Sequence, residues 1–346
     1  MKLLGFAGSA AALFLLTACG GGGGEDKAGA SGLDTVTVQL DYQLRGGHGM
    51  FYVAQKLGYF QQERIEVESI KRGTGSPDAL RTVGTGRADF GFGDLPSLVT
   101  ARSQGVPVKA LAAVNQASPL GMCSLKRNLE LSSVASLKGR TVGVHSAGST
   151  FIFYQALLAA NKMQRGEMKE FTVTPPFENY LIQGRVDAVP CYIDAEVPQL
   201  EEAAGGAGTL SVLLGSDAGY DVYGSGLFAG DEMIKKNPDL VQRFTNAYLK
   251  AFTYVLDHPA ETAKLLSETA PENASKAGLF QKQLQADIDH TFTSDVTTAN
   301  GLGAMDEAEW QSTIDVLAGQ GVLKGAKPTT KDVYDDTFVK AYGAKN

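Results

Sequence analysis

Short β-type runs alternate with helical patterns along much of the chain, and this alternation limits the fold more than any other feature. The first series of β-type runs covers 35–40, 65–70, 89–92 and 108–114, and the second covers 141–144, 171–174 and 187–193. Strands that alternate with helices predict parallel sheets covered on both faces. Two series, separated near Ser118 and Pro119, therefore predict two α/β lobes, each a mostly parallel sheet flanked by helices.

The segment from Asp231 onward has a mainly helical pattern instead. Asn237 and Pro238 predict the start of a helix, because a capping residue is followed by proline at the first helical position. An apolar stripe at helical spacing runs through 240–255 and is expected to pack against a lobe. The full length of 346 residues is too large for one ordinary core, which agrees with two lobes.

The N-terminal segment has the pattern of a lipoprotein signal. Lys2 is followed by an apolar run over 3–16, and small residues then lead to Cys19. We expect 1–18 to be removed as a signal peptide, Cys19 to be lipidated, and the glycine-rich 19–33 to act as a tether. The protein would then be held at a membrane outside the cytoplasm, in the periplasm or on the outer cell surface. An ordinary signal peptide and a retained apolar segment are the alternatives.

Charge and cysteine content exclude several classes of function. The net charge is −7 and no basic cluster occurs, so a nucleic-acid partner is not expected. Besides Cys19 the chain has only Cys123 and Cys191, which either pair in an oxidising compartment or remain as buried thiols. No Cys/His spacing resembles a zinc site, and we expect neither a metal nor another cofactor.

The sequence carries none of the usual catalytic motifs. It contains no G-x-S-x-G, H-E-x-x-H or G-x-x-x-x-G-K-[ST] pattern, so enzymatic activity is not expected. Polar and aromatic residues instead gather in the turns from strand to helix, where open α/β sheets bind ligands. The turn over 143–150 leads into a helix N-terminus whose N–H groups either receive an anionic or polar ligand atom or simply belong to a capped helix.

Several sequence blocks follow one another in a recognisable order. They are DY (41–42), HGMFYVAQ (48–55), GYF (58–60), GTGRADFG (84–91), ARSQGVPVK (101–109), LKGRTVGV (137–144), QGRVDA (183–188) and NP (237–238). Together they resemble the substrate-binding proteins of ABC importers of the thiamine-pyrimidine-precursor type (NMT1/THI5-like), which are related to binders of sulfonates, taurine and nitrate. The resemblance covers nearly all of 35–340.

This resemblance implies a type II periplasmic-binding-protein fold, in which two α/β lobes close over a ligand in the cleft between them. Lobe one would comprise 34–118 together with 225–346, and lobe two would comprise 119–224. Cys123 and Cys191 would then both belong to lobe two, which keeps a disulfide between them possible.

The first turn of the chain departs from the family pattern. Members that bind pyrimidine precursors typically show D-W-x-P-N-x-x-H there, and Asp41 and His48 match its first and last residues. Tyr42, Leu44 and Arg45 replace the Trp, Pro and Asn. Tyr42 still offers an aromatic face for stacking, and Arg45 adds a planar donor fork that suits a carboxylate, phosphate or sulfonate.

In lobe two, the YIDAE run (192–196) resembles the family's aromatic residue followed by a glutamate, whose carboxylate could accept a hydrogen bond from a ring amine. The structural alternatives are a core position for Tyr42, a surface ion pair for Arg45, and a first-turn helix position for Glu196. The predicted ligand-binding residues are Tyr42, Arg45, His48 and Asp94 from lobe one, and Ser146, Ser149, Thr150, Tyr192 and Glu196 from lobe two.

The function implied by the resemblance is that of a lipid-anchored, monomeric solute receptor. It would pass a small heteroaromatic ligand, such as a thiamine-precursor pyrimidine, to an ABC permease and its ATPase. An organic anion such as an alkanesulfonate, taurine or nitrate is the alternative ligand. Eukaryotic pyrimidine synthases share this fold but carry a cysteine-rich cluster that this sequence lacks. A sensory or adaptor role without transport is a further alternative.

Overall fold

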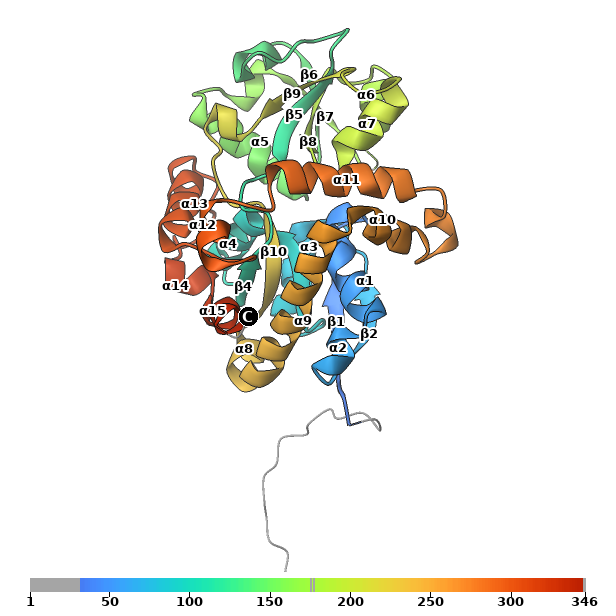
Figure 1. Cartoon of the computed structure of the whole chain (residues 1–346). Helices are drawn as coiled ribbons and strands as arrows, with labels where there is room; N and C mark the ends of the chain where they lie inside the picture. The colour runs from blue at the N-terminus through green and yellow to red at the C-terminus, as the bar shows by residue number, and fades with distance from the viewer. Residues whose placement is uncertain (1–31, 175, 177, 345–346) are drawn as a thin grey trace, which may run out of the picture.

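The computed structural model describes residues 32–174, 176 and 178–344. The signal peptide predicted for 1–18, the lipidation at Cys19 and most of the 19–33 tether lie outside the described residues. The described chain forms two five-stranded sheets flanked by helices, one above the other in Figure 1. The predicted two-lobed α/β fold is confirmed.

The lower sheet in Figure 1 has the strand order β2-β1-β3-β10-β4. Its strands are β1 (Asp34–Gln39), β2 (Ile65–Lys71), β3 (Phe90–Asp94), β4 (Val108–Ala113) and β10 (Ser225–Gly230). β1 is parallel to β2 and β3, whereas β10 is antiparallel to β3 and β4. β10 is reversed because the chain enters it from the other lobe, which places Ser225 opposite Asp94, the last residue of β3.

The upper sheet repeats this arrangement with the order β7-β6-β8-β5-β9. Its strands are β5 (Leu120–Leu125), β6 (Thr141–Val144), β7 (Lys169–Thr172), β8 (Ala188–Tyr192) and β9 (Leu210–Leu214). β5 is the reversed strand, and its first residue Leu120 pairs with Tyr192 at the end of β8. In both sheets the strand that follows a crossing between lobes starts at the carboxyl edge of its neighbour, so the two carboxyl edges face each other.

Helices connect the strands and cover the sheets. In the first part of the chain these are η1 (Gly46–His48), α1 (Gly49–Lys56), α2 (Tyr59–Gln62), α3 (Ser76–Gly84) and α4 (Leu95–Ser103). The upper lobe contains η2 (Val134–Leu137), α5 (Ser149–Ala160), η3 (Arg165–Glu167), α6 (Glu178–Ile182), α7 (Glu196–Ala204) and η4 (Ser216–Ala218).

The C-terminal part is helical, as its sequence predicted. It consists of α8 (Asp231–Lys236), α9 (Pro238–Asp257), α10 (Pro259–Ser267), η5 (Pro271–Asn273), α11 (Ala277–His290), α12 (Asp295–Asn300), α13 (Glu307–Gly319), α14 (Thr330–Val333) and α15 (Thr337–Gly343). The apolar stripe of α9 is buried, and Phe244 from this stripe stacks on Phe90 of β3 with ring centroids 3.7 Å apart. α11 runs along the boundary between the lobes and contacts both η1 and α7 (Figure 1).

Cys123 of β5 and Cys191 of β8 form a disulfide with their Cα atoms 5.9 Å apart. Both cysteines are fully buried in an apolar cluster of the upper lobe. The sequence left this pairing open, because nothing in it shows that two positions 68 residues apart lie on adjacent strands.

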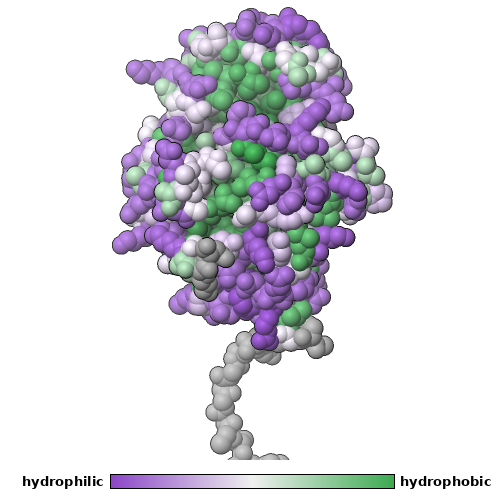
Figure 2. All heavy atoms as spheres, in the orientation of Figure 1, coloured by the Kyte–Doolittle hydropathy of each residue, from purple (hydrophilic) through white to green (hydrophobic). Residues whose placement is uncertain are grey.

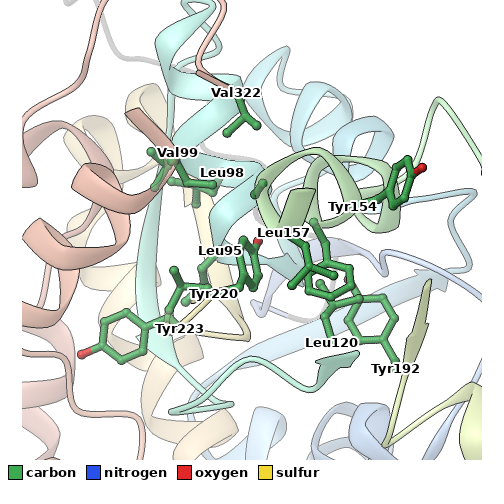
Figure 3. Packing of buried hydrophobic residues seen from close by; sticks show 14 of the residues in the cluster. Leu95, Leu98, Val99, Leu120, Tyr154, Leu157, Tyr192, Tyr220, Tyr223 and Val322 are labelled. Atoms are coloured by element: carbon green, nitrogen blue, oxygen red, sulfur yellow. The ribbon is translucent and has the colours of Figure 1, made fainter. Parts of the chain in front are cut away.

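The two lobes share an apolar core behind the cleft. Leu95, Leu98 and Val99 from α4 belong to the same buried cluster as Leu120 of β5 and Leu157 of α5 (Figure 3). A buried area that is continuous across both crossings stabilises the packing of one lobe on the other. The same cluster contains Leu120, Tyr220 and Tyr223, which flank the two crossings between the lobes, so this apolar contact lies next to the hinge.

The face of the molecule in Figure 2 is dominated by hydrophilic residues, with smaller hydrophobic areas between them. Over residues 32–344, apart from the two positions not described, Leu57 is the one large hydrophobic side chain that is exposed, at 38%. None of the helices in this part of the chain combines the length and apolar character needed to cross a bilayer.

Candidate functional site

A small cavity lies between the lobes, where the carboxyl edges of the two sheets face each other. Its volume is about 40 Å³, which holds water molecules but no organic ligand until the lobes or side chains move. The lining residues are Asp41, Tyr42, Arg45, Thr74, Gly75, Ser76, His145, Gly148, Ser149, Thr150, Tyr192, Ala195 and Glu196. The predicted site residues in this wall are Tyr42, Arg45, Ser149, Thr150, Tyr192 and Glu196.

A larger chamber of about 340 Å³ adjoins this inner cavity. Four residues line both spaces, namely Tyr42, Arg45, Ala195 and Glu196. The remaining walls of the outer chamber come from the turn after β1, from α7, and from Lys276 and the start of α11. The inner cavity and the outer chamber therefore share one wall, to which Tyr42 contributes a phenol and Glu196 a carboxylate.

Tyr192 and Glu196 bring the end of β8 and the first turn of α7 to the cavity wall. The hydroxyl of Tyr192 lies 2.7 Å from the Ser149 hydroxyl at the start of α5. Glu196 accepts a hydrogen bond from the backbone N–H of Tyr192 at 2.9 Å through one carboxylate oxygen, and its side chain remains part of both cavity walls. The first-turn helix position of Glu196 and its place in the candidate site are thus compatible.

Two helix N-termini converge on the inner cavity. Thr74, Gly75 and Ser76 lead into α3 of the lower lobe, while Gly148 and Ser149 lead into α5 of the upper lobe. A Cβ added at Gly75 would lie 3.9 Å from the Cα of Gly148, so the two turns are close neighbours across the boundary. Helix N-termini favour acceptor atoms, because their first N–H groups have no partner within the helix.

His48 is fully buried and lies behind the cavity wall rather than in it. Its Nδ1 accepts a hydrogen bond from the backbone N–H of Arg45 at 3.3 Å, so the proton of the neutral ring is on Nε2. Nε2–H donates to the carboxylate of Asp41 at 2.9 Å. The ring edge also packs against Phe92, with centroids 5.4 Å apart. His48 therefore fixes Asp41 and the turn that carries Arg45.

The protonation states of this group follow from its burial and its charges. Burial would raise the pKa of Asp41, but the charge of Arg45 and the hydrogen bond from His48 outweigh it and hold that pKa well below its usual range. Burial and then the positive charge of Arg45 lower the pKa of His48 to about 4. At neutral pH the group consists of a carboxylate, a guanidinium and a neutral imidazole.

Arg45 joins the two lobes. Its Nη1 donates to Asp41 of the lower lobe at 2.9 Å, and its Nε lies 3.5 Å from a carboxylate oxygen of Asp194 in the upper lobe. The guanidinium also lies over the ring of Phe92, 5.7 Å from its centroid. Burial would lower the pKa of Arg45, but Asp41 and Asp194 outweigh it and raise that pKa. The sequence suggested that the charge of Arg45 suits an anionic ligand, but Asp41 and Asp194 of the protein balance this charge. The alternative of a surface ion pair for Arg45 is corrected as well, because the ion pair is buried.

Asp94 and Ser146 also lie outside the cavity lining. Asp94 is 1% exposed and caps α4, where one carboxylate oxygen accepts from the backbone N–H and the hydroxyl of Ser97 at 2.8 and 2.5 Å. Burial raises the pKa of Asp94 to about 7, although the hydrogen bonds from Ser97 oppose it. Ser146 is exposed on the turn before α5. Its hydroxyl therefore faces solvent, while Ser149 and Thr150 line the cavity.

The cavity wall also contains residues that are not among the predicted ligand-binding residues. Asp41 was recognised as part of the first-turn pattern, and Thr74 and Ser76 belong to a strand-to-helix turn of the kind that the analysis associated with ligands. Asp194, in the YIDAE run (192–196), and Asp287, on α11, are buried at the lobe boundary. No sequence signal links these two aspartates, which lie 93 positions apart and meet only through the fold.

Two α/β lobes with reversed crossing strands, a shared hinge-side core and a polar cavity between them define the class of periplasmic binding proteins. Within that class, the chain belongs to the NMT1/THI5 like family, whose model matches residues 46–262.

Individual relatives agree with this assignment. The chain is 28% identical to the riboflavin-binding protein RibY of Chloroflexus aurantiacus over 313 residues, covering 89% of this chain and 86% of that one. It is 26% identical over 248 residues to the 4-amino-5-hydroxymethyl-2-methylpyrimidine phosphate synthase THI13 of Saccharomyces cerevisiae, covering 69% and 72%. The periplasmic aliphatic sulphonate binding protein SsuA of Escherichia coli has a similar structure, with a TM-score of 0.66 at 16% identity, covering 88% and 92% of the chains.

Proposed function

We propose that this chain is an extracytoplasmic solute-binding lipoprotein of an ABC importer, and that it captures a small heteroaromatic ligand between its lobes. The family and the fold support a binding role, and the cysteine at position 19 supports a membrane anchor. The lobes would pass the ligand to a permease driven by its ATPase, with the receptor acting as a monomer. Confinement to the membrane raises the local concentration of the receptor near the permease.

The observation that carries the ligand class is the pairing of Tyr42 and Glu196 in the walls of both chambers. An aromatic face and a carboxylate in the shared wall of two chambers suit a flat ring that bears an amine. Tyr192 and Ser149 supply hydroxyls at the inner end, where ring nitrogens or carbonyl oxygens would be held. RibY and THI13 are named for a flavin and an aminopyrimidine, which are both flat heterocycles.

The charge balance of the site argues against an organic anion as the main ligand. The inner cavity is lined by the carboxylates of Asp41 and Glu196 and by one guanidinium, which Asp194 also neutralises. An anion would have to bind among these carboxylates in a region of low dielectric. The two helix N-termini keep an alkanesulfonate as the second candidate, because they offer N–H groups to acceptor oxygens.

A thermal-shift and calorimetric comparison tests these assignments. The full-length chain is titrated with 4-amino-5-hydroxymethyl-2-methylpyrimidine, riboflavin, and ethanesulfonate as the anionic arm. A ligand that binds the folded state alone raises the melting temperature by mass action. We expect stabilisation by one of the two heterocycles. Stabilisation by ethanesulfonate alone would replace the heteroaromatic assignment with the anionic one, and no response to any of the three would overturn both.

A matched pair of variants on α7 tests the role of Glu196. Glu196→Gln removes the charge and should weaken an amine-bearing heterocycle by about 10-fold to 100-fold, as expected for a hydrogen bond to a charged group. Glu202→Gln, an exposed position on the same helix, should leave the affinity unchanged. Equal affinities of the two variants would show that Glu196 does not contact the ligand.

A further inference from the structure

Two buried aspartates meet across the boundary between the lobes, outside the cavity wall described above. Asp194 follows β8 in the upper lobe, and Asp287 lies on α11, which packs on η1 of the lower lobe. Their exposed fractions are 1% and 0%. Two carboxylates in such a place repel each other and lose hydration, so at least one of them needs a compensating charge or a proton.

The hydrogen-bond pattern shows which oxygen can carry a proton. Oδ1 of Asp287 accepts from Nδ2 of Asn115 at 2.5 Å and from the hydroxyl of Thr291 at 2.9 Å. Among the described residues, Oδ2 of Asp287 is buried without a hydrogen-bond partner, and the oxygens of Asp194 have no contact closer than Arg45 Nε at 3.5 Å. A carboxylic acid that accepts at Oδ1 and donates from Oδ2–H to the carboxylate of Asp194 satisfies this arrangement.

The charges that face the pair leave an excess of negative charge. Arg45 is the cation next to Asp194, but Asp41 shares it. His48 is neutral, as shown above, and the phenol of Tyr248 on α9, whose pKa burial and Asp287 raise, also faces Asp287. With Asp41, Asp194 and Asp287 all ionised, three carboxylates would face one guanidinium. No group of side chains among the described residues could hold a metal ion there.

We propose that Asp287 holds a proton and shares it with Asp194 when the lobes are closed, as they are in this structure without a ligand, so that opening of the lobes releases one proton. The proton forms an acid–carboxylate hydrogen bond between an element of the lower lobe and one of the upper lobe. The arrangement also includes a residue of the hinge. Asn115, which lies between β4 and β5, donates a hydrogen bond to Oδ1 of Asp287, the oxygen that does not carry the proton. The proposal rests on the boundary alone and requires no particular ligand.

The direction of the pKa changes supports this arrangement. Burial, and then the negative charge of Asp194, raise the pKa of Asp287 well above its usual range, although Arg45 opposes them. Burial raises the pKa of Asp194 as well, and Arg45 again opposes it. Because Asp287 ionises more easily in the unfolded chain, its contribution to stability is present at low pH and is lost as the pH rises toward the folded pKa.

Infrared difference spectroscopy on the full-length chain without ligand tests for the proton directly. The wild-type protein at neutral pH should show the carbonyl stretch of a protonated carboxyl that disappears in Asp287→Asn. Asp289→Asn, on an exposed position of α11, should keep this band. Because burial raises the pKa of Asp94 to about 7, the spectra are compared in an Asp94→Asn background. The proposal would be overturned if the wild type showed no such band, or if the band remained unchanged in Asp287→Asn.

Lobe closure and stability provide a second readout. Asn at position 287 mimics the neutral acid, since its amide can donate to Asp194 and accept from Asn115. We expect small-angle scattering to show that the lobes of Asp287→Asn stay closed as the pH rises, whereas the lobes of the wild type open once Asp287 ionises. Above about pH 4, the unfolding equilibrium constant of the wild type should rise about tenfold per pH unit relative to the variant. Identical pH profiles would overturn the proposal.

A second variant, Asp194→Asn, tests the proposal if Asp287→Asn does not fold. In Asp194→Asn, the amide at position 194 can donate a hydrogen bond to Asp287. The guanidinium of Arg45 also loses Asp194 as a charge partner, so more of its positive charge acts on Asp287. Asp287 should then ionise, and the infrared band should be lost although Asp287 is intact. Retention of the band in Asp194→Asn would show that the proton is not shared between the lobes.

Discussion

Reduction of the disulfide between Cys123 and Cys191 should destabilise the upper lobe strongly. The bond joins positions 68 residues apart on adjacent strands β5 and β8. In the chain-entropy treatment, a cross-link that closes a loop of this length removes about 15 cal/mol/K of entropy from the unfolded chain. This amounts to about 4 kcal/mol of unfolding free energy at 25 °C.

Urea unfolding of one and the same chain, with the bond oxidised or reduced, measures this effect without changing any side chain. With an m-value of about 3 kcal/mol/M, the unfolding midpoint should fall by about 1.5 M on reduction. Because both cysteines are fully buried, the bond should be reduced slowly in the folded protein and quickly in urea. The double variant Cys123→Ala/Cys191→Ala is the control, since its midpoint should not respond to the reductant.

Equal midpoints for the oxidised and reduced chains would refute the reasoning. They would mean that the cross-linked strands are already held together in the unfolded ensemble, or that strain in the folded state cancels the entropic gain. A loss confined to the transition of the upper lobe would instead show that the two lobes unfold separately.

Two further predictions concern the turn that supports the site. Gly46→Ala should destabilise the fold by about 1–3 kcal/mol in urea unfolding, because its Cβ would lie 2.6 Å from the backbone atoms Leu284 N and Phe280 O of α11; an unchanged midpoint would contradict this close approach. His48 should make the protein acid-labile: since its folded pKa is lowered to about 4, its contribution is complete above the unfolded pKa of 6.5 and is lost as the pH falls, by about 3 kcal/mol in total. His48→Gln should remove this part of the pH dependence of stability, and the same change at His258, whose side chain is 43% exposed, should not.

The sequence predicted most of the fold but missed the strands that complete it. The β-type runs of the two series were recognised because apolar residues alternate within them or end at turn residues. The sequence did not predict β5, because all six of its residues are buried and a short run that is buried on both faces shows no alternation of apolar and polar residues. The direction of β5 and β10 depends on where the chain crosses between the lobes, and the local pattern of apolar and polar residues does not indicate these crossings.

The candidate site shows the same division. Tyr42, Ser149 and Tyr192, which the sequence predicts to bind ligand, line the cavity, because strand-to-helix turns at carboxyl edges are determined by the order of elements. Arg45 lines it too, but its charge is directed at Asp41 and Asp194. A local motif identifies a donor fork and the nearby Asp41 that occupies part of it. The second acceptor, Asp194, lies 149 positions away and meets Arg45 only in the folded chain.

The replacement of the family's asparagine by Arg45 cannot be interpreted as a change in ligand charge alone. An asparagine at this position would remove the cation beside the buried carboxyl of Asp194, which would then have to take up a proton or remain an unpaired buried charge. Arg45 and Asp194 therefore form one unit across the lobe boundary, and Asp287 belongs to it because its proton removes the remaining excess charge. Tyr42 and Glu196 line both chambers and are the residues that we propose select the ligand. Selection by an aromatic face and a carboxylate favours a neutral or amine-bearing ring, which is the ligand class that we propose.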